Sequence, residues 1–281
     1  MPLRRVDAVC HPDTAANADG WFSDEATAVL LDGATPQAAA PISSYVNDTV
    51  WLVRRFLELW PALSRKGHGA AERAELVRLA LRDEYAGLCE KAGARPEDAP
   101  FACLAIAHDT GERLELYNMG DLTLLLRGGD GTVRRFGESA VRELDQRAIA
   151  GLRRALAAGV APHAERLRAI AAELAQNRML RNVLPGYEVL EPGVSCLGRF
   201  QRSMSASHAE RSLLMMSDGF YRLVDTFERY SDLTLFDAVE RRGLASLLEE
   251  LRAIEVGDEQ CLRWPRFKTH DDASALWLEL T

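Results

Sequence analysis

Acidic side chains stand at the ends of apolar segments at several places along this 281-residue chain. Each adjoins a run of residues typical of a buried strand, so folding can bring acids that are distant in sequence to one edge of a core. These acids are Asp32, Asp121, Asp218 and Asp271. Hard cations such as Mg²⁺ and Mn²⁺ take oxygen ligands and need few carboxylates, because they keep several waters. The pattern therefore indicates a divalent-cation site.

A glycine directly follows two of these acids, in Asp32-Gly33 and Asp218-Gly219. An Asp-Gly pair taken alone is most often a tight turn, because these are the residues that tight turns need. Glycine also leaves the carbonyl next to an acid sterically free to act as a further oxygen ligand. Both interpretations stay open for each pair, but several acids at strand ends favour the metal site.

Asp19 is a further candidate, because residues 17–32 read as two short strands around a polar turn at residues 23–25. A turn centred between Asp24 and Glu25 places residue 19 opposite residue 30. Asp19 and Asp32 are then diagonal neighbours on one face of the ribbon, and a slip of one residue would separate them.

Hydrophobic spacing predicts the elements that must position these acids. Helical spacing covers residues 46–60 and 77–88, two further helices within 138–182 with a break near 159–162, and helices over roughly 222–255. Further strands are expected at 101–107, 113–118, 122–127, 132–136, 187–190, 194–199, 212–217 and 273–280. The glycine-rich stretch 128–131 is expected to be a hairpin turn and not a phosphate-binding loop, because no helix begins after it.

Strands followed by helices in two rounds, without regular alternation, favour an α+β layered sandwich over a doubly wound parallel sheet. The sequence contains no internal repeat and no linker rich in Pro, Gly or Ser. A single domain over residues 1–281 is therefore expected, with the helical stretch 138–182 inserted between strands.

The net charge of −8 argues against a protein whose main partner is nucleic acid or an anionic membrane surface. No apolar run reaches the length of a membrane-spanning helix, and residues 1–7 lack the apolar segment of a secretory signal. The five cysteines form no Cys-x-x-Cys pair and suit free thiols in a reducing compartment. A cytoplasmic location is expected.

Five short motifs in this order resemble the protein phosphatase 2C family of metal-dependent Ser/Thr phosphatases, particularly its bacterial members. They are Asn17-Ala18-Asp19, Leu31-Asp32-Gly33, Asn118-Met119-Gly120-Asp121, Ser217-Asp218-Gly219 and Asp271-Asp272-Ala273-Ser274. The resemblance implies a four-layer αββα sandwich, in which two antiparallel sheets are flanked by helices and enclose a cleft with two Mg²⁺ or Mn²⁺ ions. It implies direct attack of a metal-bridging water on phosphoserine or phosphothreonine of a phosphorylated protein, without a phosphoenzyme.

On the same pattern, Asp32 bridges both metals and the Gly33 carbonyl ligates one of them. Asp218 and Asp271 ligate the other metal, and Asp121 resembles the acid used for a third, weaker ion. Asp32 and Asp218 are thus the expected catalytic residues through the metal-bound water. Asp19 is expected to hold metal-bound waters, and Asp272 to have a structural role.

The chain departs from the family pattern at three places, which motivates an alternative function. Residues 13–16 lack the arginine that binds substrate phosphate, Ala18 replaces a glutamate, and Ala34 stands where the family often has His or Met. His11 and His208 are the candidate proton donors, although each also suits an ordinary surface or capping histidine. The alternative is a weak or inactive pseudophosphatase that binds a phosphorylated partner or has a regulatory role.

The insertion at 138–182 lies where the family carries a variable flap beside the active site. The resemblance implies that it selects substrates or docks a regulatory partner. Its arginines can favour a phosphorylated protein, but acids interleaved with them also suit an ordinary solvated helix face. They include Arg147, Arg153, Arg154, Arg166 and Arg168.

Overall fold

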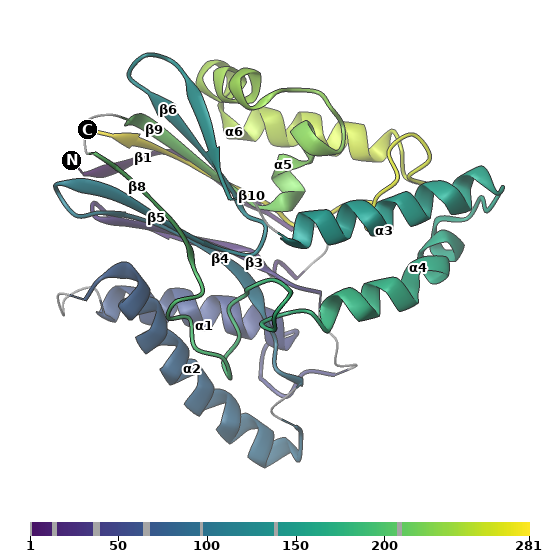
Figure 1. Cartoon of the computed structure of the whole chain (residues 1–281), viewed down its shortest axis with the longest axis horizontal. Coiled ribbons are helices and arrows are strands. Elements are labelled where there is room, and N and C mark those ends of the chain that lie inside the picture. The colour runs from purple at the N-terminus through teal and green to yellow at the C-terminus, as the bar shows by residue number, and fades with distance from the viewer. Residues whose placement is uncertain are drawn as a thin grey trace.

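Two antiparallel sheets face each other at the centre of the computed structural model, which describes residues 2–12, 16–35, 40–63, 68–95, 98–137, 140–206 and 210–281 (Figure 1). The first sheet has the order β1-β10-β9-β6-β7, with β1 Leu3–His11, β10 Ala273–Leu280, β9 Glu210–Met216, β6 Thr123–Gly128 and β7 Val133–Phe136. The second has the order β2-β3-β4-β5-β8, with β2 Gly20–Ser23, β3 Thr27–Gly33, β4 Ala102–Asp109, β5 Arg113–Met119 and β8 Gln201–Ala206.

Helices cover the outer face of each sheet and complete the four layers. Helices α1 Asp48–Leu63 and α2 Ala70–Ala92 pack on the second sheet, and α5 Asp218–Asp225 and α6 Asp232–Val256 pack on the first. Helices α3 Ala140–Ala157 and α4 His163–Arg178 form a pair that projects from one end of the sandwich (Figure 1). This architecture confirms the predicted α+β sandwich of two antiparallel sheets flanked by helices. Across the described ranges, no helix combines the length and the apolar character needed to cross a bilayer.

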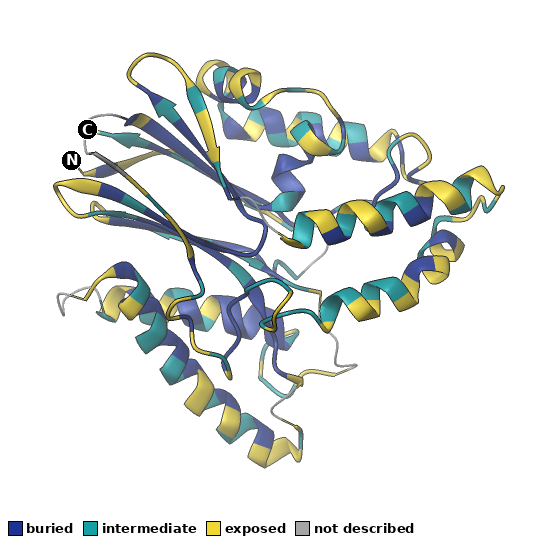
Figure 2. Cartoon of the chain, viewed as in Figure 1, coloured by how far each residue is buried: buried dark blue, intermediate teal, exposed yellow. Residues whose placement is uncertain are grey.

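The buried side chains form separate layers that follow from the alternation of residues along each strand. Alternate positions such as Leu30 and Leu276 fill the layer between the sheets. Their neighbours on the same strands point outward, so that Leu31 packs under α1 and α2 while Ala275 packs under α5 and α6. Figure 2 shows the central strands mostly buried, whereas α3 and α4 carry many exposed and half-buried positions.

The β2–β3 hairpin has the expected strands, but its register differs by two residues from the predicted one. Gly20 pairs with Leu31 and Ser23 with Ala28, so continuing the register places Asp19 directly opposite Asp32 and not on its diagonal. The loop explains the shift, because the Asp24 carboxylate accepts hydrogen bonds from the backbone N–H groups of Ala26 at 3.0 Å and Thr27 at 2.6 Å. A shift by two residues keeps both acids on the same face.

Two predicted strands are wrong, and two observed strands, β1 and β8, were missed. Residues 187–190 and 194–199 make only isolated bridges, and strand β8 begins later, at Gln201. The segment between them contains Pro192 and Gly193, which interrupt a regular ladder. Strand β1 was missed because its charged residues hide the alternation expected of a strand, although it pairs along its length with β10.

Candidate functional site

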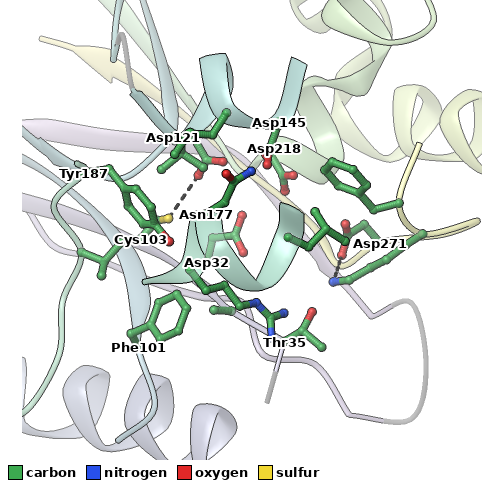
Figure 3. Close-up of a pocket in the computed structure, with 18 of the residues that line it drawn as sticks. Asp32, Thr35, Phe101, Cys103, Asp121, Asp145, Asn177, Tyr187, Asp218 and Asp271 are labelled. Carbon is green, nitrogen blue, oxygen red and sulfur yellow. Dashed lines mark hydrogen bonds and ion pairs between the residues drawn. The ribbon is translucent and has the colours of Figure 1, made fainter. Parts of the chain in front are cut away.

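A cavity of about 580 Å³ opens at one end of the sandwich, where α3 and α4 approach the ends of the strands. Four of the predicted acids line it, together with Gly33 and with side chains from α3 and α4. Figure 3 shows the acids Asp32, Asp121, Asp218 and Asp271 around this cavity. Residues from opposite ends of the sequence therefore meet here.

Each acid is held by the end of a strand, and the two sheets contribute separately. Asp32 belongs to β3 of the second sheet, whereas Asp218 follows β9 and Asp271 precedes β10, both strands of the first sheet. Asp121 lies in the short connection by which the chain passes from β5 in one sheet to β6 in the other. The site therefore lies across the boundary between the sheets.

Close backbone approaches explain two of the motif glycines. A Cβ at Gly219 would lie 1.9 Å from the carbonyl oxygen of Asp272, so only glycine lets the start of α5 approach the segment that carries Asp271. Gly120 has φ +94°, and a Cβ there would lie 2.2 Å from the Cys103 sulfur. These contacts bring Asp218 next to Asp271, and Asp121 next to strand β4.

Asp19 lies behind these acids and is fully buried. Neither of its carboxylate oxygens has a hydrogen-bond partner within the described part of the chain. Burial raises the pKa of Asp19 to about 8, with a further contribution from the charge of Asp272, while the nearby Ser274 hydroxyl acts in the opposite direction. A buried carboxylate without a donor is costly, so this group fits a position that faces a cation or cation-bound water.

The other acids show the same electrostatic conflict. Burial raises the pKa of Asp32 well above its ordinary value, and the neighbouring charges of Asp19 and Asp218 add to that effect. Burial also raises the pKa of Asp121 to about 6, again with Asp218 as the main unfavourable charge. Carboxylates this close cannot all ionise without a positive partner, and divalent cations supply one. The residues present therefore fit a divalent metal.

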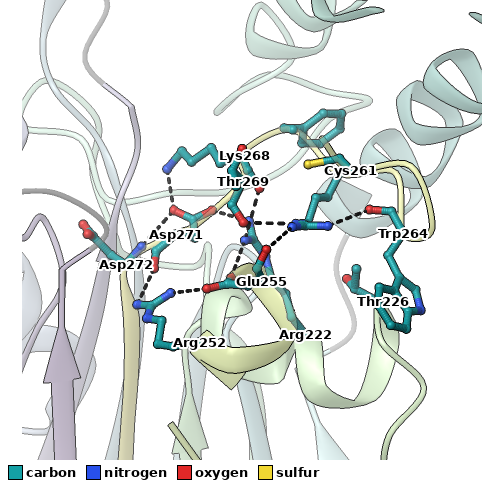
Figure 4. Close-up of polar contacts among 12 residues, drawn as sticks. Arg222, Thr226, Arg252, Glu255, Cys261, Trp264, Lys268, Thr269, Asp271 and Asp272 are labelled. Atoms are coloured by element: carbon teal, nitrogen blue, oxygen red, sulfur yellow. Dashed lines mark hydrogen bonds and ion pairs between the residues drawn. The ribbon is translucent and has the colours of Figure 1, made fainter. Parts of the chain in front are cut away.

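No group of three His, Cys, Asp or Glu side chains in the described ranges already stands in the arrangement of a metal site. Asp271 shows one reason, because its oxygens accept from other groups: Oδ2 from Arg222 Nη2 at 2.6 Å and Oδ1 from Lys268 Nζ at 2.5 Å (Figure 4). Arg222 also binds Glu255. A carboxylate has about four acceptor positions, so Asp271 can still take a metal ion, but its charge is already compensated.

The neighbouring Asp272 connects its own motif to the motif that contains Asp19. Its Oδ2 accepts a hydrogen bond from the backbone N–H of Ala18 at 2.8 Å, which fixes the segment carrying Asp19 against the start of β10. This contact fits the structural role expected of Asp272.

Asp145 and Cys103 also belong to this site, although the sequence analysis did not identify either. Asp145 reaches the cavity from α3, and burial raises its pKa to about 8, with Asp121 as the strongest neighbouring charge. Cys103 is paired with Asp32 across β3 and β4, and its thiol donates to Asp121 Oδ1 at 3.1 Å. Neither residue belongs to a motif, and only the amphipathic pattern of α3 could have shown that one of its faces is buried.

The remaining sequence candidates lie elsewhere. His11 is exposed, its ring pairs with the carbonyl of Pro12, and it does not line the cavity. His208 and residues 13–15, where the family arginine would fall, lie outside the described residues. Of the arginines in the insertion, Arg166 is buried and bonds backbone carbonyls at 160 and 161, whereas Arg168 lines the cavity.

Comparison with known proteins identifies the class to which this fold and site belong. The sequence model described as protein phosphatase 2C matches residues 13–253, and the chain therefore belongs to the protein phosphatase 2C family. No curated protein sequence gives a significant match.

Solved structures share the fold over the whole chain. The Mycobacterium tuberculosis serine/threonine phosphatase PstP/Ppp is 17% identical with a TM-score of 0.58, and covers 100% of this chain and 99% of its own. The catalytic domain of PstP in complex with two manganese ions is 17% identical with a TM-score of 0.56, covering 99% and 98%. PppA of Pseudomonas aeruginosa, described as a regulatory component of T6SS, is 14% identical with a TM-score of 0.55, covering 100% and 99%.

Proposed function

We propose that this chain is a metal-dependent phosphoprotein phosphatase that hydrolyses phosphoserine and phosphothreonine with Mg²⁺ or Mn²⁺. The observation that carries the proposal is the convergence of buried acids from both sheets on one cavity, where their pKa values are raised and positive charge is needed. Family membership and the manganese complex of PstP support the same activity.

Asp32, Asp218 and Asp271, with the Gly33 carbonyl, are the proposed ligands of two ions, and Asp121 with Asp145 suits a third. Two bound divalent cations supply a water of lowered pKa and neutralise charge on the phosphoryl oxygens. Asp19 stands behind Asp32 with free carboxylate oxygens, which suits accepting hydrogen bonds from water held by the acids. Arg222 orients the Asp271 carboxylate through the bond to its Oδ2.

The side chains around the cavity favour direct hydrolysis over a covalent phosphoenzyme. Cys103 is the thiol nearest the acids, but burial raises the pKa of this thiol well above its ordinary value, and the charge of Asp121 raises it further. A thiol that stays protonated is a poor nucleophile. Water is therefore the nucleophile that the proposal assigns, and Cys103 has no part in the attack.

Hydrolysis of p-nitrophenyl phosphate and of a phosphothreonine peptide tests the proposal, with Mn²⁺, Mg²⁺ or a chelator present. Turnover should require the metal, and Asp32→Asn and Asp218→Asn should each lower kcat/KM by about 10² to 10³-fold, because each removes charge that faces the reacting group. Asp83→Asn on the exposed surface of α2 is the matched control and should keep full activity.

Calorimetric metal titration of the same proteins separates the possible failures. Metal binding without turnover of either substrate would contradict the proposed phosphatase activity and favour the pseudophosphatase alternative. No feature of the described residues supports that alternative independently. Turnover that persists in the chelator would contradict the metal-dependent mechanism.

A further inference from the structure

Helix α4 presents one side to the cavity that holds the acids. Its lining residues recur at intervals of about one helical turn, so they share a face of the helix. They are Leu167, Arg168, Ala171, Leu174, Asn177 and Arg178. The apolar members lie toward the middle of the helix, and the polar pair Asn177 and Arg178 lies at its C-terminal end.

The polar end of this face has unused hydrogen-bond donors. The Asn177 Nδ2 atom is buried and has no hydrogen-bond partner in the described chain, and Figure 3 draws this side chain with the acids that line the cavity. Among the described residues, only backbone atoms of Arg178 are hydrogen-bonded, and its guanidinium takes part in no ion pair or hydrogen bond. By contrast, the cavity cations Arg222 and Lys268 are both bound to Asp271. A buried amide donor without an acceptor, next to the half-buried guanidinium of Arg178 at the edge of a cavity, fits a ligand that brings acceptor oxygens.

The remainder of the cavity is apolar and larger than a phosphoryl group requires. Leu144 of α3 and Leu167 and Leu174 of α4 line it together with Phe101 and Val189. Its volume of about 580 Å³ falls in the range of sites that enclose a whole organic ligand. An apolar group attached near the phosphate would therefore be buried here with a gain in binding free energy.

An exposed apolar segment continues from this wall to the surface. Met179, Val183 and Leu184 are 74%, 49% and 93% exposed, and they lie between Arg178 and Tyr187, which both line the cavity. Exposed apolar side chains in a segment whose two ends line a cavity suit contact with a macromolecule. This continuity favours an extended peptide over a compact small molecule.

We propose that α4 is the substrate-recognition element, in which Asn177 and Arg178 bind the phosphoryl group and the apolar wall binds a large apolar residue next to the phosphorylated one. The substrate class is thus a phosphopeptide segment with an aromatic or branched aliphatic neighbour of the phosphoserine or phosphothreonine. In this proposal Arg178 takes the place of the arginine that the first motif lacks. This inference rests on the proposed function for the identity of the substrate group.

Binding of a peptide that cannot be hydrolysed tests the inference independently of turnover. The probe is a fluorescein-labelled peptide with the methylenephosphonate analogue of phosphothreonine between two phenylalanines, and its partner has two glutamines instead. Fluorescence anisotropy with Mn²⁺ should show about tenfold tighter binding of the phenylalanine peptide. Leu174→Ser should reduce that preference below about threefold without changing the unfolding temperature by more than a few degrees.

The polar contact is tested by Arg178→Gln and Asn177→Leu. Each substitution should weaken the binding of both phosphonate peptides by about tenfold, because it removes a donor to the phosphoryl oxygens. The ratio of the two dissociation constants should stay unchanged. Matched controls are Arg153→Gln on the exposed side of α3 and Leu233→Ser, which is 47% exposed on α6. Both controls should bind like the wild type.

Equal binding of the two peptides by the wild type, or tighter binding of phenylphosphonate than of either peptide, would overturn the apolar-neighbour proposal. Unchanged binding in both Arg178→Gln and Asn177→Leu would overturn their role at the phosphate. The expected binding pattern in a protein without turnover would instead refute the proposed catalysis and leave the recognition site standing.

Discussion

Asp19 is the residue at which the proposed metal binding would be coupled most directly to proton release. In the folded chain without metal its pKa of about 8 lies far above the value of roughly 3.9 for an unfolded aspartate. Between these values the folded state holds a proton that the unfolded state has released. The stability of the metal-free chain therefore falls as pH rises from about 4 to about 8.

Metal binding should consequently tighten as the pH rises from 6 to 8, because cations compete with protons for these carboxylates. We expect the apparent affinity for Mn²⁺ to rise by up to about tenfold per pH unit for each proton displaced. Calorimetry in buffers of different ionisation enthalpy measures the protons released. The Asp19→Asn variant should release fewer protons on binding Mn²⁺ than the wild type does. Its metal-free chain should be more stable at pH 8 by more than about 1 kcal/mol. An affinity that is flat across this interval would contradict the prediction.

The candidate acids at strand ends could be predicted from sequence because each combines a local signal with a backbone requirement. A side chain at Gly219 or Gly120 would collide with Asp272 or Cys103, so the glycines next to Asp218 and Asp121 are required by close backbone approaches. The pairing of Asp271 with Lys268 and Arg222 could not be predicted in the same way. Such contacts depend on side-chain positions across α5 and the segment before β10, for which the sequence holds no periodic signal.

Among the elements, the helices and central strands followed from hydrophobic periodicity, and the errors fell where periodicity is weak. Strand β1 was not predicted because it lies at a sheet edge and has charged residues on its exposed side. The two-residue register shift of the β2–β3 hairpin came from the Asp24 side chain, which sets the loop by hydrogen bonds to Ala26 and Thr27. Side-chain capping of this kind overrides a symmetric count of residues.

The pair formed by α3 and α4 has its own small core, separate from the cores under the sheets. Ala148, Leu152 and Ile170 are buried at this contact, and Phe267 packs against them. Because so few buried side chains join the pair to the rest, its opening should require less free energy than unfolding of the sandwich.

Ile170→Ala should therefore loosen the pair locally. Removing this buried side chain should lower the free energy of local opening by about 2 to 5 kcal/mol. Hydrogen exchange followed by mass spectrometry should show faster exchange in α3 and α4, with β4 and β9 unchanged. Leu233→Ala on the exposed surface of α6 serves as the control. Equally faster exchange in all elements would show that the pair is not a separate unit.

At the scale of the whole molecule, the layer between the sheets joins both halves of the chain. Leu30 and Leu116 of the second sheet pack there with Leu124 and Leu276 of the first. We therefore propose that residues 1–281 unfold as one domain, apart from the early opening of α3 and α4.

Leu276→Ala should lower the free energy of unfolding of both sheets together, by about 2 to 5 kcal/mol. Trp51 and Trp60 on α1 report on one outer layer, and Trp264 and Trp277 report on the other. Two variants, each retaining only one of these tryptophan pairs, should show the same denaturant midpoint by fluorescence, and it should equal the midpoint by circular dichroism. Separate midpoints for the two pairs would indicate two domains.

Asp32 and Asp218 extend from opposite sheets, so the spacing between them depends on how far one sheet is offset along the other. The side chains of the inner layer set that offset, because interiors are close-packed and transmit a change of volume to the backbone. Substitutions such as Leu124→Ile or Leu276→Met would thus alter the spacing of the proposed metal ligands without touching any of them. The positions at which substitutions could change the preferred metal therefore lie in the buried layer between the sheets.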